Sequence, residues 1–106
     1  MSGWLARVQH DLVKRLLWPA RDRRELGGAP APDELTPRLT DDEGQPTTVA
    51  ALWRSLRAAA PPGLSAGALD AFQQALERAV AAGERGDVDG VLALERAFAD
   101  LRQERG

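Results

Sequence analysis

The chain contains 106 residues, with 14 lysines and arginines against 16 aspartates and glutamates, so its formal net charge is −2. A chain of this length forms no more than one domain with a modest core. Because cysteine is absent, disulfides and thiolate-bound metals are excluded. No apolar run approaches the roughly 20 residues of a membrane span, and the first residues lack the features of a signal peptide. We therefore expect a cytoplasmic protein.

The composition favours helices over strands. The large apolar residues are mostly leucine and valine, isoleucine and tyrosine are absent, and alanine is abundant, a mixture that suits helices. We predict an all-α fold, namely a small bundle of three to four helices. It has a C-terminal antiparallel helical hairpin and a long Pro/Gly-rich loop after the first helix.

The first predicted segment, residues 1 to 26, is a basic amphipathic helix that contains two of the three tryptophans. In it, apolar residues recur at spacings of three and four, which places them on one side of a helix. Ser2 is the predicted N-cap. Pro19 lacks the amide donor that a continuing helix needs, so we expect a stop or a kink there, then a short charged continuation that Gly27 and Gly28 end. The apolar residues are Leu5, Val8, Leu12 and Leu16.

Charge is unevenly distributed along the chain. Residues 1 to 24 carry six basic side chains against two acidic ones, whereas residues 25 to 50 carry one arginine against six acids. A basic head indicates either an anionic partner or an acidic segment that folds back and neutralises it. The sequence leaves both interpretations open.

The second predicted segment, residues 27 to 46, is an acidic Pro/Gly-rich linker. It contains four of the seven prolines and three of the ten glycines, and its large apolar residues are Leu35 and Leu39. A connection this long is either mobile or lies along a surface through those two leucines. Its acidic run, residues 41 to 43, is a solvated loop or an acidic handle for a basic surface.

The third predicted segment, residues 47 to 106, is a helical core. Thr47 or Thr48 caps its first helix, Ser65 opens the second and Asp87 caps the third. Pro61, Pro62 and Gly63 separate the first helix from the second, and the second ends at Gly83 or Gly86. The short connection between the last two predicts an antiparallel hairpin, with both phenylalanines in its core.

The residues available for catalysis are few. The chain has one histidine and no cysteine or tyrosine, and the neighbours His10 and Asp11 point about 100° apart on a helix. Asp87 and Asp89 stand at ligand positions of a calcium loop, but arginines occupy its first and last positions. We therefore predict a non-enzymatic protein with no catalytic residue, cofactor or metal, and His10 as a surface residue.

We predict that the first helix is the docking element of an accessory or adaptor protein. The three downstream helices suffice for a core, which leaves the first helix free to lay its apolar face in a groove of a partner protein or of a second copy. If the first helix instead completes the bundle, that face is buried. The predicted partner-binding residues are Trp4, Leu5, Val8, Leu12, Lys14, Arg15, Leu16, Trp18, Arg21, Arg23 and Arg24.

Two other classes of partner fit the same helix. Interfacial helices carry tryptophan and leucine on one side and basic residues on the other, so attachment to a membrane surface is the first alternative. Nucleic-acid binding through the arginines is the second, although the chain is acidic and has no helix-turn-helix spacing. The sequence does not identify the partner.

Overall fold

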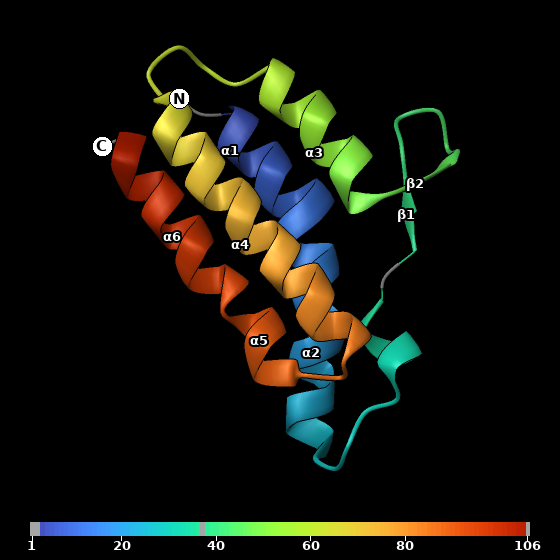
Figure 1. The fold of residues 1–106 in the computed structure, drawn as a ribbon. Helices are drawn as coiled ribbons and strands as arrows, with labels where there is room; N and C mark the ends of the chain where they lie inside the picture. The colour runs from blue at the N-terminus through green and yellow to red at the C-terminus, as the bar shows by residue number, and fades with distance from the viewer. Residues whose placement is uncertain (1–2, 37, 106) are drawn as a thin grey trace.

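The computed structural model describes residues 3–36 and 38–105, and it confirms the predicted all-α fold. Within these residues, four helical rods form the bundle (Figure 1). The first rod runs without a break from Gly3 to Leu26. The others are α3 (Val49–Ala58), α4 (Ala66–Glu84), and α5 (Val88–Leu92) continued by α6 (Leu94–Arg105).

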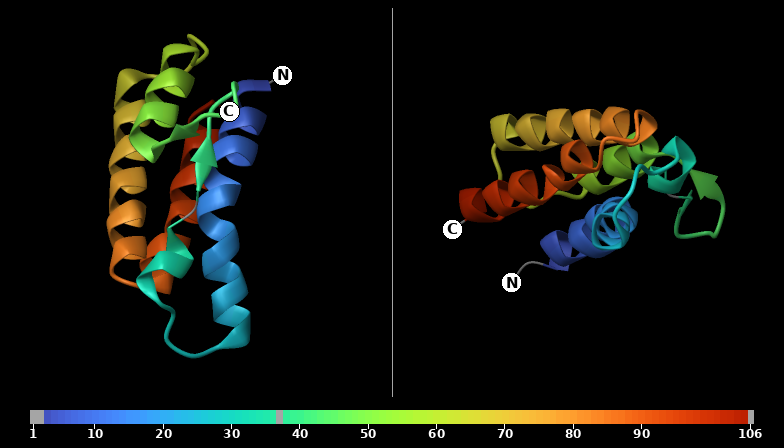
Figure 2. Two further views of the ribbon diagram at one scale, coloured as in Figure 1. Left: turned by 90° about the vertical axis from the view of Figure 1, so that its right-hand side faces the viewer. Right: turned by 90° about the horizontal axis from the view of Figure 1, so that it is seen from below.

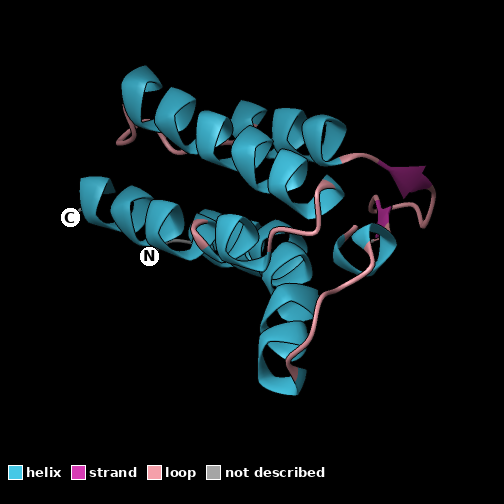
Figure 3. Ribbon diagram, turned by 60° about the horizontal axis from the view of Figure 1, so that its bottom comes forward, coloured by secondary structure: helices cyan, strands magenta, loops and turns pink. Residues whose placement is uncertain are grey.

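The first rod contains an internal irregularity. It consists of α1 (Gly3–Val8), a π-helical turn η1 (Gln9–Val13) and α2 (Lys14–Leu26). After the π turn, the amide of Lys14 donates to the carbonyl of Gln9, five residues earlier. Of the stop or kink predicted at Pro19, the stop does not occur, since the helix continues through this residue. The rod changes direction along its length (Figure 3), as helices do at prolines and π turns.

Burial explains why α2 continues through Pro19. A proline inside a helix removes a hydrogen bond and costs about 3 kcal/mol. Leu16, Leu17 and Ala20 flank it and are buried in the core. Burial of a leucine side chain stabilises by about 1.5–3 kcal/mol, so the tertiary contacts outweigh the local cost. The helix ends at Gly27, where φ is 75°, as predicted.

Polar side chains cap the later helices. Thr48, Ser65 and Asp87 are the N-caps of α3, α4 and α5, and each side chain accepts a hydrogen bond from the amide three residues later. These three predictions are confirmed, whereas Ser2 lies outside the described residues. Between α4 and α5 the chain turns at Gly86, whose φ of 74° suits glycine.

A series of aromatic rings crosses the bundle. The ring centroids of Trp4 and Trp53 lie 6.2 Å apart, those of Trp53 and Phe72 5.1 Å, and those of Phe72 and Phe98 6.3 Å. Rings at such distances stabilise by edge and offset contacts. The series joins α1, α3, α4 and α6. In Figures 1 and 2, α4 and α6 lie side by side in opposite directions, with the first rod against α5 and α6.

The predicted linker lies along the surface of the bundle. It contains a 3₁₀ turn, η2 (Pro32–Leu35), and a strand, β1 (Leu39–Thr40), that pairs antiparallel with β2 (Pro46–Thr47). Leu35 and Leu39 are buried and anchor the segment. Gly83 of α4 permits the close approach, because a Cβ there would lie 2.9 Å from the carbonyl oxygen of Leu35. The core therefore draws on all three predicted segments and extends beyond residues 47 to 106.

Candidate docking surface

The apolar face of the first rod belongs to the core of this protein. Val8 and Leu12 have no exposed surface, and Leu16 exposes 2%. Leu5 is partly buried against the same core. The prediction that these four residues bind a partner is therefore corrected, because in the folded bundle they contact the protein's own helices.

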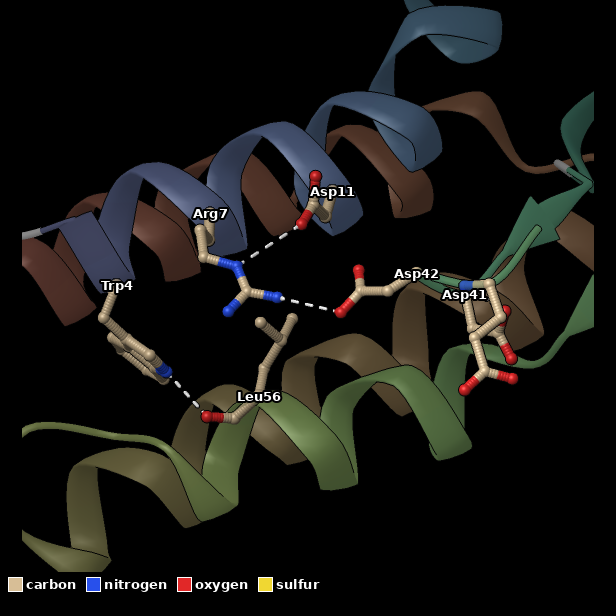
Figure 4. Close-up of polar contacts among 7 residues, drawn as sticks. Trp4, Arg7, Asp11, Asp41, Asp42 and Leu56 are labelled. Atoms are coloured by element: carbon tan, nitrogen blue, oxygen red, sulfur yellow. Dashed lines mark hydrogen bonds and ion pairs between the residues drawn. The ribbon is translucent and has the colours of Figure 1, made fainter. Parts of the chain in front are cut away.

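Trp4, a predicted anchor for a partner's groove, is instead bonded inside the bundle. Its indole Nε1 donates a hydrogen bond of 2.6 Å to the carbonyl oxygen of Leu56 in α3 (Figure 4). Its ring also contacts Trp53. The N–H and one side of the ring thus already have partners within the fold. Trp4 therefore has a structural role in the bundle.

Most arginines of the basic head are neutralised by carboxylates of the same chain. The carboxylates come from the first rod, from the segment after it and from the last two helices, so internal neutralisation explains much of the charge asymmetry. The three arginines at the end of α2, which were predicted to bind a partner, thus have carboxylate partners within the fold. The pairs are Arg21 with Glu95, Arg23 with Glu34, and Arg24 with Asp89. Arg7 lies 3.7 Å from a carboxylate oxygen of Asp11 and 3.7 Å from one of Asp42 (Figure 4).

Lys14, Arg15 and Trp18 are the predicted residues that remain for a partner. Trp18 exposes 72% of its surface, and among the described residues only Leu26 is a comparably exposed large apolar residue. Within the described part of the chain, neither Lys14 nor Arg15 has an ion pair. They line a shallow hollow of about 490 Å³. We name its lining the Trp18 surface: His10, Lys14, Arg15, Trp18, Pro19 and Arg38.

Two elements build the Trp18 surface. The first rod supplies five of its residues, among which His10, Lys14 and Trp18, and likewise Arg15 and Pro19, follow at intervals of four positions and so lie on one side of the helix. Arg38 comes from the loop, where the buried Leu39 next to it holds the chain against the bundle. Local periodicity does not reveal Arg38, because it meets the helix through a contact between distant parts of the sequence. One signal was present, since Arg38 is the single basic residue among residues 25 to 50.

The Trp18 surface combines an exposed indole ring with cations that lack internal partners. Lys14, Arg15 and Arg38 have no carboxylate within reach among the described residues. Tryptophan and arginine dominate the binding energy of many protein interfaces, and guanidinium groups pair strongly with carboxylates. The surface contains no hydroxyl, thiol or carboxylate side chain. Its cations are therefore free to pair with carboxylates.

A larger groove of about 830 Å³ lies between α3, α4 and the β1–β2 hairpin. The core residue Trp53 forms part of its floor and donates from Nε1 to Oε1 of Gln73 at 3.0 Å. Arg57 donates to the same oxygen at 2.8 Å and lies 2.6 Å from a carboxylate oxygen of Asp70. These contacts join α3 to α4, so Trp53, Arg57 and Gln73 have a structural role.

The chain matches no protein-family model, and comparisons with curated proteins and with solved structures find no match either. None of the helices in the described part of the chain has both the length and the apolar character that crossing a membrane requires. Among residues 3–36 and 38–105, no group of three or more histidine and carboxylate side chains is arranged to hold a metal ion.

Proposed function

We propose that this chain is a non-enzymatic, cytoplasmic accessory protein that binds a partner protein through the Trp18 surface. The observation that carries the proposal is the exposure of Trp18. Four of the five aromatic residues form the series of rings in or against the core, whereas Trp18 leaves 72% of its surface in water. Covering such a ring in a partner's pocket contributes about 2 kcal/mol or more at interface hot spots.

The cations of the Trp18 surface favour an acidic partner. The other arginines of the first rod pair with carboxylates of the same chain, whereas Lys14, Arg15 and Arg38 have no such partner in the described residues. A partner protein with carboxylates at this surface would give these three cations the ion pairs that the other arginines form within the chain. The proposed mechanism therefore uses the exposed side of the helix, while its apolar face stays in the bundle.

The membrane and nucleic-acid alternatives have less support. An interfacial helix inserts a whole apolar face into the lipid, and here that face is buried, so Trp18 is a single anchor. Nucleic-acid sites line a surface with many cations, whereas this surface has few cations in a chain of net charge −2. A protein partner accounts best for one tryptophan with a few basic neighbours.

Affinity purification of the tagged full-length chain, with point variants beside it, tests the proposal. The Trp18→Ala variant, and separately the Lys14→Glu/Arg15→Glu double variant, should each lower capture of the partner by about tenfold or more. Mass spectrometry of the captured proteins measures the loss. Undiminished capture by Trp18→Ala would overturn the proposal.

Two matched controls keep the result specific. Leu26→Ala removes the other exposed large apolar residue of the rod and should leave capture unchanged. Arg78→Glu/Arg96→Glu alters the net charge as much as the Lys14/Arg15 change does, but on exposed positions of α4 and α6, and should also leave it unchanged. Deletion of residues 1 to 24 is unsuitable, because it removes core residues and tests folding instead.

Two further assays separate the alternative partners. Co-sedimentation with anionic lipid vesicles tests the membrane, and a gel shift with single-stranded and double-stranded DNA and RNA tests nucleic acid. Neither should show binding. If lipid or nucleic acid binds, if increased salt weakens this binding and if Trp18→Ala abolishes it, then that ligand and not a protein is the partner of the Trp18 surface.

A further inference from the structure

A turn with three acidic residues, Asp41, Asp42 and Glu43, follows β1, and we name it the acidic turn. Basic side chains of the same chain neutralise it only weakly. Oδ1 of Asp41 accepts the N–H groups of Glu43 and Gln45, both at 2.9 Å, and so sets the shape of the turn. The side chain of Asp42 is 88% exposed, and Arg7, at 3.7 Å, is its one cationic partner in the described residues. Glu43 has none there. Exposed ion pairs of this kind contribute little, so both carboxylates remain available to a second molecule.

The acidic turn lies beside the Trp18 surface. Arg38 of that surface directly precedes β1 and the turn directly follows it, so at most about 14 Å of extended chain separates Arg38 from Asp42. On the first rod, Arg7 contacts Asp42 (Figure 4), and Arg15 of the Trp18 surface follows about 12 Å further along. A negative area and a positive area are thus neighbours on one face of the bundle.

A face with two such neighbouring areas is complementary to its own copy. Turning a second molecule by 180° about an axis through the face places its acidic turn over the first molecule's Trp18 surface, and symmetry forms the reciprocal contact. We infer that this face is the interface of a twofold-symmetric homodimer. Lys14 and Arg15 pair there with Asp42 and Glu43 of the second copy, and Trp18 adds the apolar contact.

This inference rests on the proposed function, because it names a second copy of the chain as the partner of the Trp18 surface. Each contact occurs twice in such a dimer, so a charge change in one area acts at two places. Opposite charge reversals in the two areas are therefore complementary between molecules. This property permits a stringent test.

Two charge-reversed variants provide that test. Lys14→Glu/Arg15→Glu makes both areas acidic, and Asp42→Lys/Glu43→Lys makes both basic. Sedimentation equilibrium at low salt, at up to about 100 µM chain, should show the unaltered protein as a dimer. Each variant alone should dimerise with a Kd at least about a hundredfold higher than that of the unaltered protein. Their equimolar mixture should form a heterodimer with a Kd within about tenfold of the unaltered protein.

Three results would overturn the dimer. They are an unaltered chain that stays monomeric at about 100 µM, variants that still dimerise alone, and a mixture that stays monomeric while the unaltered chain dimerises. Circular dichroism establishes that each variant is folded. If a reversed variant is not, Lys14→Gln/Arg15→Gln takes its place and should weaken the dimer by about tenfold, and undiminished dimerisation would again overturn the inference.

Failure of the dimer and failure of the proposed function are distinguishable. A monomeric chain that captures another protein, and loses it on Trp18→Ala, contradicts the homodimer but retains the Trp18 surface as a docking site. A dimer that both charge reversals leave intact, with capture of other proteins unaffected by Trp18→Ala, contradicts both.

Discussion

Truncation of Leu12 to alanine tests whether the first rod is part of the core. Leu12 lies in the π turn and has no exposed surface. Its removal loses about 0.8 kcal/mol for each buried carbon, and the cavity adds to this. We expect Leu12→Ala to lower the free energy of unfolding by about 3–4 kcal/mol. Domains of this size unfold at a cost of about 5–15 kcal/mol, so the loss is a large share of the total. Tm should fall by roughly 12–30 °C.

Leu26→Ala is the matched control, because it makes the same substitution in the same rod at a residue that is 72% exposed. Its free energy of unfolding should change by less than about 0.5 kcal/mol. Urea titrations followed by far-UV circular dichroism measure both variants. Equally small losses at Leu12 and Leu26 would refute the reasoning, because the first rod would then contribute little to the core and its apolar face would be free for a partner.

Two further substitutions test individual contacts of the fold by the same titration. Gly83→Ala should destabilise by about 1–3 kcal/mol, since its Cβ would lie 2.9 Å from the Leu35 carbonyl oxygen. Gly67→Ala, in the same helix with its nearest neighbour at 3.9 Å, should stabilise by about 0.5–1 kcal/mol, and equal effects at the two glycines would contradict the close approach. Trp4→Phe should cost about 1 kcal/mol, because it removes the indole donor to the Leu56 carbonyl. Unchanged stability would show that this hydrogen bond does not form in solution.

The predictions that hold depend on neighbouring residues in the chain. Thr48, Ser65 and Asp87 cap helices through amides three residues away, and such contacts follow from local backbone geometry. Of the two outcomes predicted at Pro19, a stop or a kink, the stop was wrong for the opposite reason. The cost of proline in a helix is local, but the burial of Leu16 and its neighbours that offsets the cost comes from packing against other helices.

At the candidate site, too, local sequence predicted some residues and tertiary packing decided the others. Lys14, Arg15 and Trp18 were predicted as docking residues from the helical pattern, and the structure leaves them accessible. The other predicted residues are used within the fold, for example Val8 in the core and Arg24 in an ion pair with Asp89. Which cations acquire internal carboxylates depends on contacts between segments far apart in sequence, and no local spacing specifies these contacts.

The sequence by itself determined the helical class, the amphipathic first helix and most helix ends, because periodicity, capping and composition act locally. Only the tertiary structure decided which side of the first helix is available. The bundle buries its apolar face, pairs most of its arginines, and brings Arg38 next to Trp18. The basic helix with its two tryptophans is therefore part of the core on one side and the candidate docking surface on the other, since core packing takes the apolar side and leaves the polar side to solvent.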